Sequence, residues 1–114
     1  MATFAELAGT TTPDGCDSVS FAPALLGEGK QTQHRHLYWE FYEGGVSQAV
    51  LLDGRWKANR PVDPAAMVQL FDLQIDLGEK HDVAASNPDV VARITEIMTT
   101  EHRDNEHWKF PPVR

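Results

Sequence analysis

The 114-residue chain contains five histidines, and their spacing is the first test for a metal site. His34 and His36 are two residues apart, so on a strand they face the same side and can share an ion. Two imidazoles supply only half of a tetrahedral ligand set, and no cysteine pair or H-E-x-x-H pattern accompanies them. His102 and His107 lack the i, i+4 spacing of one helical face. We therefore expect no metal site, and keep metal binding by His34 and His36 as a third hypothesis.

The single cysteine, Cys16, lacks the surroundings of a nucleophile. Asp14 and Asp17 flank it, and nearby anions are expected to raise the pKa of a thiol. The acidic loop at residues 72–82 lacks the D-x-[DN]-x-[DN]-G order of an EF-hand. The sequence also contains no G-x-S-x-G and no phosphate-cradling glycine loop. These residues indicate neither a catalytic site nor a bound cofactor.

An aromatic hairpin is the most distinctive stretch of the sequence. Residues 36–58, HLYWEFYEGGVSQAVLLDGRWKA, hold two of the three tryptophans and both tyrosines. Alternation along LYWEFY separates two faces, and we expect Trp39 and Phe41 to form core under a helix. The opposite face is too apolar to be designed for water alone. It supplies the candidate contacts for a substrate or a domain interface: Tyr38, Glu40, Tyr42, Trp56 and Lys57.

The strands that position these residues are predicted from turns and alternation. Gly44-Gly45 and Asp53-Gly54 are typical of tight hairpin turns. They separate apolar runs that read as successive antiparallel strands. We expect strands at residues 37–42, 46–52, 55–59 and, as a possible fourth, 69–73.

A long helix is predicted near the end of the sequence. Asn87 is a good N-cap, and Pro88 suits the first helical position. The apolar residues that follow form one stripe: Val90, Val91, Ile94, Ile97 and Met98. The expected fold is α+β, a three- to four-stranded antiparallel sheet (a meander) with one long C-terminal helix packed on one face.

Composition and charge exclude several classes of function. The formal net charge is −7, and the isoelectric point is near 5.0. Both values argue against a nucleic-acid binder and against an anionic membrane surface as a partner. No apolar run approaches the roughly 18 residues of a transmembrane candidate. The start, MATFAELAGTTTP, lacks the basic and apolar regions of a signal peptide.

The order of several motifs resembles the C-terminal region of type I sulfatases, the arylsulfatase family of the alkaline-phosphatase-like superfamily. Residues 3–27 are similar to a family segment that contains TFAELAG and SFAPALLG. LYWEF, a glycine pair and DGRWK follow at residues 37–57, and an LFDL…GE pattern precedes the last helix at residues 70–88. The resemblance covers nearly all of the chain. Leu51 and Leu77 depart from the arginine and the proline that are common at these positions.

The resemblance implies that the chemistry lies elsewhere. Sulfatases of this family hydrolyse sulfate esters with a formylglycine, made from Cys or Ser in a C/S-x-P-x-R motif, beside a calcium ion. CDSVS at Cys16 has neither the proline nor the arginine, and Asp104-Asn105 lacks the surroundings of the family's calcium-binding pair. Formylglycine and calcium are thus expected in a missing catalytic domain. Residues 1–34 are interpreted as a residual helix and linker from that domain, and residues 35–114 as the sulfatase C-terminal subdomain.

These interpretations lead to a first hypothesis and an alternative. The first is a sulfatase fragment that is inactive alone, with a structural and cleft-shaping role beside the catalytic domain. Its parent is expected to be periplasmic, secreted or cytoplasmic. Because an apolar face would lack its partner, we also expect self-association as a two-fold dimer. The alternative is an independent module that binds a glycan or a protein through the aromatic hairpin.

Overall fold

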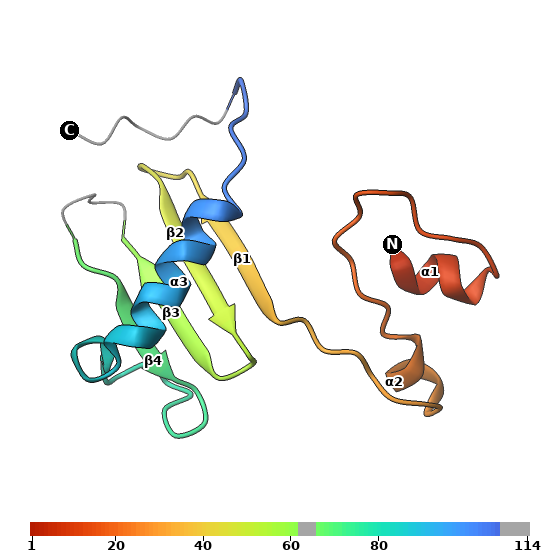
Figure 1. Ribbon diagram of the computed structural model, residues 1–114, viewed down its shortest axis with the longest axis horizontal. Coiled ribbons are helices and arrows are strands. Elements are labelled where there is room, and N and C mark those ends of the chain that lie inside the picture. Colours follow the sequence, from red (N-terminus) through yellow and green to blue (C-terminus); the bar gives the residue numbers. More distant parts are fainter. Residues whose placement is uncertain (62–65, 108–114) are drawn as a thin grey trace. The chain divides into compact units, whose positions relative to one another are not determined.

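The computed structural model describes residues 1–61 and 66–107, and the chain divides into two compact units (Figure 1). The first unit, Met1–His34, contains two short helices, α1 (Ala2–Leu7) and α2 (Ala22–Leu26). The second unit begins at Arg35 and contains a sheet, a short 3-10 turn and one longer helix. Its elements are β1 (His36–Phe41), β2 (Ser47–Leu52), β3 (Trp56–Arg60), β4 (Gln69–Asp72), η1 (Ala84–Ser86) and α3 (Pro88–Thr100).

The sheet is a four-stranded antiparallel meander in the order β1-β2-β3-β4. The turn between β2 and β3 uses Asp53 and Gly54, both with positive φ, at 53° and 65°. Positive φ at both positions gives a turn whose twist matches that of the flanking strands. Arg55 is the third connecting residue, and Leu52 pairs with Trp56. The predicted α+β fold, with four strands and one long helix, is confirmed.

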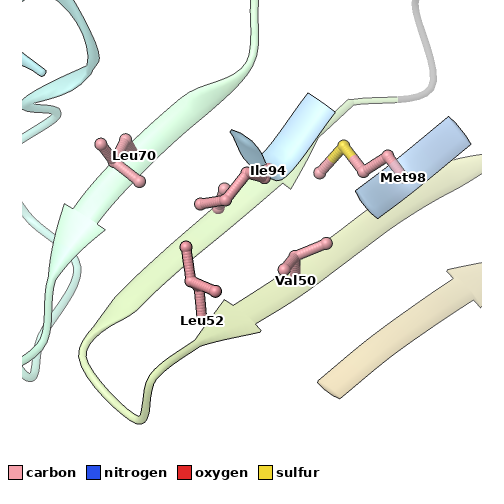
Figure 2. Packing of buried hydrophobic residues seen from close by; sticks show 6 residues of the cluster. Val50, Leu52, Leu70, Ile94 and Met98 are labelled. Carbon is pink, nitrogen blue, oxygen red and sulfur yellow. The ribbon is translucent and has the colours of Figure 1, made fainter. Parts of the chain in front are cut away.

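The core lies between the sheet and α3. Figure 1 shows α3 lying across the sheet, and Figure 2 shows side chains of both elements meeting. Ile94 and Met98 of α3 are 0% and 1% exposed, and they pack with Val50, Leu52 and Leu70. Full burial of such a side chain contributes about 1.5–3 kcal/mol, so these residues supply much of the stability of the second unit. The predicted apolar stripe of this helix therefore faces the core, with Ile94 and Met98 as its buried members.

The structure corrects the predicted direction of the strand faces. The register places Tyr38 beside Val50, and Val50 beside Ala58, all on the side of the sheet that faces α3. Trp39 and Phe41 therefore lie on the other side, where they are 39% and 58% exposed. The prediction that these two residues form core under the helix is wrong. We call that side the outer face; its apolar residues are Leu37, Trp39, Phe41, Ala49, Leu51 and Phe71.

Helix α3 begins at Pro88, as predicted, but Asn87 does not cap it with its side chain. The side-chain amide of Asn87 instead donates to the carbonyl of Val83 at 2.9 Å. It thus fastens the turn that precedes the helix. Asp89 stands in the first turn, where a negative charge is favourable for the helix dipole.

In the first unit, backbone N–H groups donate hydrogen bonds to side-chain hydroxyl groups of distant residues. The backbone N–H of Ala2 donates to Oγ of Ser18 at 3.0 Å, and that of Phe21 donates to Oγ1 of Thr3 at 3.1 Å. Gly9, with φ of 67°, follows the C-cap residue of α1, Ala8, and its left-handed backbone ends the helix. Large apolar side chains of this unit are exposed: Met1, Phe4, Leu7, Phe21, Leu25 and Leu26. Within residues 1–61 and 66–107, no helix has the length and apolar character needed to cross a membrane.

Candidate functional site

The carboxylate of Glu40 is the centre of a hydrogen-bond network where β1 meets the segment after α3. The Tyr38 hydroxyl donates to Oε1 of Glu40, and the Tyr42 hydroxyl donates to Oε2 at 2.6 Å. Nδ1 of His102 lies 2.7 Å from Oε1. The Glu40 side chain is only 15% exposed. We call Tyr38, Glu40, Tyr42, Gln48 and His102 the Glu40 cluster.

Strand register brings the members of the cluster together. Tyr38 and Glu40 alternate along β1, so both face α3, and Gln48 is the register partner of Glu40 on β2. The buried Gln48 amide donates to the Tyr38 hydroxyl at 2.7 Å and to the carbonyl of Met98 at 3.0 Å. Its oxygen accepts a hydrogen bond from Arg60 at 2.8 Å. The cluster therefore ties three strands to the last turns of α3.

The protonation states within the cluster depend on one another. Burial by itself raises the pKa of Glu40, but hydrogen bonds from its phenol partners and from His102 outweigh burial, so the pKa lies below its ordinary value. The hydrogen bond to Glu40 raises the pKa of His102, against the effect of burial, and Asp104 adds to the rise. The same carboxylate raises the pKa of Tyr42 to about 12, and burial is the main cause of the raised pKa of Tyr38. At neutral pH the cluster thus contains a carboxylate and two neutral phenols.

This arrangement is suited to holding side chains rather than to nucleophilic catalysis. Glu40 accepts hydrogen bonds from both tyrosines and pairs with His102, so most of its acceptor positions are occupied and its basicity is reduced. Next to it is a hollow of about 570 Å³ with aromatic and charged walls. The hollow is lined by Glu40, Phe41, Tyr42, Glu43, Arg103 and Asn105.

Trp56 and Lys57, the other two predicted contact residues, lie outside the Glu40 cluster. Trp56 packs against the core, with the Arg55 guanidinium 4.4 Å from the centre of its ring. Arg55 also donates to both carboxylate oxygens of Asp72, at 3.1 and 2.6 Å. Lys57 is on the outer face and pairs with Glu79 at 2.8 Å. The structure therefore gathers three of the five predicted residues; contact of all five with a substrate or a domain stays a prediction.

The expected pKa direction for Cys16 is wrong. The Cys16 thiol lies 3.0 Å from Oγ of Ser18, and this hydrogen bond lowers its pKa more than the charge of Asp17 raises it. The thiol is exposed. Among the described residues, no histidine forms a hydrogen bond with it. Its surroundings still differ from those of a formylglycine precursor, because the proline and arginine of that motif are not present.

The histidines considered as metal ligands are His34 and His36. His36, the first residue of β1, pairs with Glu101, the residue after α3, with 3.2 Å between Nε2 and Oε1. Within residues 1–61 and 66–107, no group of three or more His, Cys, Asp or Glu side chains is placed to hold an ion. These residues therefore do not fit the calcium site of the sulfatase family. Calcium and formylglycine stay predictions for a catalytic domain.

Sequence reasoning missed His102 and Gln48 as members of the cluster. His102 is 62 residues from Glu40 in the sequence, and it follows α3 in a stretch with no periodicity. Gln48 looks like an ordinary polar strand residue. A two-residue Gly44-Gly45 turn would have placed Glu40 opposite Ala49. In the structure residues 42–46 connect β1 and β2, and this longer connection pairs Glu40 with Gln48.

Solved structures resemble this chain, although no protein-family model and no curated protein matches its sequence. A 2-O GAG sulfatase superposes with a TM-score of 0.71 at 24% identity, covering 87% of this chain and 22% of that protein. A Bacteroides thetaiotaomicron sulfatase from glycosaminoglycan metabolism gives 0.68 at 26% identity, covering 88% and 23%. The protein Ps i-CgsB gives 0.69 at 26% identity, covering 88% and 22%.

These matches identify the class of structure. The fold is that of a sulfatase part: an α+β unit with an antiparallel sheet and one long helix. The chain spans about a quarter of the length of the sulfatases it matches, which it covers by 22–26%. The resemblance to the C-terminal region of type I sulfatases is confirmed, and the chain corresponds in structure to a fragment of such an enzyme.

Proposed function

We propose that this chain is the C-terminal subdomain of a sulfatase and shapes the substrate cleft of a catalytic domain without catalysing the reaction itself. The observation that carries the proposal is the extent of the structural match. In the two matches at 26% identity, the superposition covers 88% of this chain but only 22–23% of the other protein. A unit that resembles one part of an enzyme is expected to work beside the rest of it.

The outer face supplies the surface for docking on the catalytic domain. Trp39 and Phe41 are large, exposed and two residues apart on one strand, with Leu37 continuing the row. Contiguous apolar surface of this kind marks an interface with a partner. Aromatic residues are also enriched at the centre of such interfaces. Docking through these side chains would remove them from water.

The Glu40 cluster supports a cleft-shaping role. Glu40 and Tyr42 line the hollow, and their hydrogen bond, together with that from Tyr38 to Glu40, preorganises this wall. An aromatic ring and a guanidinium at the same hollow suit a polar, ring-shaped ligand such as a sugar. Phe41 belongs both to the wall of the hollow and to the outer face, so docking would place the hollow near the domain boundary.

The first experiment tests whether the chain is inactive alone. The purified chain is incubated with a chromogenic aryl sulfate and calcium, and release of the chromophore is followed. We expect no turnover, because the C/S-x-P-x-R motif is not in the sequence. Turnover that survives replacement of Cys16 by Ala and repurification would contradict the proposal.

The second experiment tests docking. The coding sequence upstream is read for a C/S-x-P-x-R motif, and the domain that it encodes is co-expressed with the chain. Trp39→Ser and Phe41→Ser should weaken co-purification, whereas Ile75→Ser, at an 84% exposed loop position, should not. An upstream sequence without the motif, or equal co-purification of all three variants, would count against a lost domain interface.

The hollow beside Glu40 favours a second candidate, the independent module that binds a glycan or a protein. In that case, the isolated chain binds sulfated or neutral sugars without any other domain. Titration with a panel of such sugars, comparing the wild type with Tyr42→Ala, distinguishes the two candidates. Binding by the isolated chain that is lost in Tyr42→Ala would favour the module.

A further inference from the structure

The segment after α3 is fastened to β1 by one histidine. Nδ1 of His102 lies 2.7 Å from Glu40, and Nε2 lies 3.1 Å from Asp104. The side chain is 19% exposed. A neutral imidazole carries one N–H and therefore donates at one nitrogen, whereas the imidazolium donates at both. Two carboxylates facing the two nitrogens thus select the protonated ring.

The hollow beside Glu40 depends on this attachment. One of its walls comes from β1 and the following turn, and the other comes from Arg103 and Asn105, which directly follow His102. Arg103 is itself bound to the end of α3, through the carbonyl of Thr100 at 2.8 Å. If residues 101–107 left β1, the second wall of the hollow would leave with them.

We propose that His102 is a pH-sensitive latch that holds residues 101–107 against β1 and so keeps the hollow formed. The proposal rests on the placement of His102 between two carboxylates from different segments. It is independent of the sulfatase function, since it concerns the described residues of this chain only.

The groups that face His102 come from each neighbouring element. Strand β1 contributes the carboxylate of Glu40 and the phenols bonded to it, and the segment after α3 contributes Asp104. Two cations are also near: Arg103, the next residue, donates to the carbonyls of Thr100 and His102 at 2.8 and 3.4 Å, and Arg60 on β3 is bonded to Gln48. The carboxylate of Glu101, at the end of α3, pairs with His36. The two carboxylates in contact with the ring of His102 favour its protonated form.

The sign of the pH dependence follows from two pKa directions. The pKa of His102 is raised above 6.5, so the latch is fully present below that value and is lost as pH rises through the folded pKa. The pKa of Glu40 is lowered below 4.5, so the latch is present above that value and is lost as pH falls through the folded pKa. The segment should therefore be held in mildly acidic solution and released at alkaline pH.

Amide hydrogen exchange of the full chain tests the latch. Protection of residues 101–107 is compared at about pH 5.5 and about pH 9, after correction for intrinsic exchange rates. In the wild type, protection should fall about three- to tenfold at the higher pH, the range for a charge-assisted bond at a partly exposed site. His102→Arg keeps the positive charge and should show a smaller fall, and His102→Gln should give low protection at both pH values.

The matched control is His81→Gln. His81 also pairs with a carboxylate, Asp76 at 3.5 Å, but its side chain is 81% exposed and lies in the loop after β4. This variant should keep the wild-type change at residues 101–107. If His81→Gln abolished that change, or if His102→Gln retained it, the latch would be assigned to the wrong group.

A titration of the unmodified chain gives a second, independent result. The imidazole proton signals of His102 should titrate above 6.5 in the wild type, and Glu40→Gln should shift the midpoint downward. A midpoint at or below 6.5, or one that Glu40→Gln leaves in place, would overturn the proposal even if the exchange variants folded poorly.

Discussion

The two units of the chain differ in what keeps them folded. The second unit has a continuous core in which Val50, Leu70, Ile94 and Met98 are at most 1% exposed. The first unit buries small residues such as Ala2 and Ala22, and its large apolar side chains point to solvent. The first unit is therefore compact without a core of large apolar side chains.

Helix length sharpens the difference between the units. Helix α3 has 13 residues and a buried stripe, whereas α1 and α2 have six and five residues. Helices this short are marginal in water without tertiary packing. The first unit therefore depends on neighbours more than the second, as expected if residues 1–34 come from a catalytic domain. That assignment stays a prediction.

The largest expected effect is the loss of the core in the second unit. Ile94→Ala should lower the free energy of unfolding by about 2–5 kcal/mol, because it leaves a cavity between sheet and helix. This is a large share of the 5–15 kcal/mol that is typical for a domain. Urea denaturation measures the change, with Glu96→Ala on the exposed side of α3 as the control. A loss below about 0.5 kcal/mol would mean that α3 is not docked on the sheet.

Self-association should depend on the outer face. We expect a two-fold dimer at micromolar concentration, and Trp39→Ser with Phe41→Ser should raise its dissociation constant on the order of tenfold or more, since aromatic residues dominate interfaces. Light scattering over a dilution series measures it, and Ile75→Ser is the exposed control. A wild type that is strictly monomeric at high concentration would argue against an unsatisfied interface.

Acid should destabilise the second unit through Asp72. Its hydrogen bonds with Arg55 lower its pKa against the effect of burial, with help from the backbone of Gln74. The stabilisation is therefore present above the ordinary pKa of 3.8 and is lost as pH falls through the folded value. Asp72→Asn should flatten the acid limb of a stability–pH curve measured by urea unfolding. Asp14→Asn, at an exposed position of the first unit, should leave the curve unchanged.

The smallest expected effect is in the first unit. Phe4 is 78% exposed, so Phe4→Ala should change the main unfolding transition by no more than about 0.5 kcal/mol. The same urea curves that report Ile94→Ala measure it. If Phe4→Ala lowered the free energy of unfolding as much as Ile94→Ala, Phe4 would have to be buried in solution, and the contrast between the two units would be wrong.

Local sequence patterns were enough to predict the strands and the helix, but not which side of the sheet the helix covers. Turn residues such as Asp53 and Gly54 set the hairpin, and the apolar stripe of α3 set the helix, because both signals are local. The side of β1 that meets α3 depends on the other strands of the sheet: Val50 on β2 and Leu70 on β4 pack in the core and decide it. Alternation on a single strand with apolar residues on both faces leaves that choice open.

The Glu40 cluster was only half visible in the sequence. Tyr38, Glu40 and Tyr42 stood out because they share a short aromatic stretch. His102 joins them through the chain path after α3, and no spacing rule connects positions 62 residues apart. Long-range polar contacts of this kind depend on tertiary packing rather than on propensity.

The meander also fixes the order in which the second unit can assemble. All three strand pairings join neighbours in sequence, so the loops that must close are short and the sheet has a low entropic barrier. Ile94 and Met98, however, arrive on α3 after all four strands. During synthesis, the four strands leave the ribosome before α3, so Val50 and Leu70 lack their partners on the helix until α3 docks. That interval is the step at which a nascent chain of this design is most prone to aggregate.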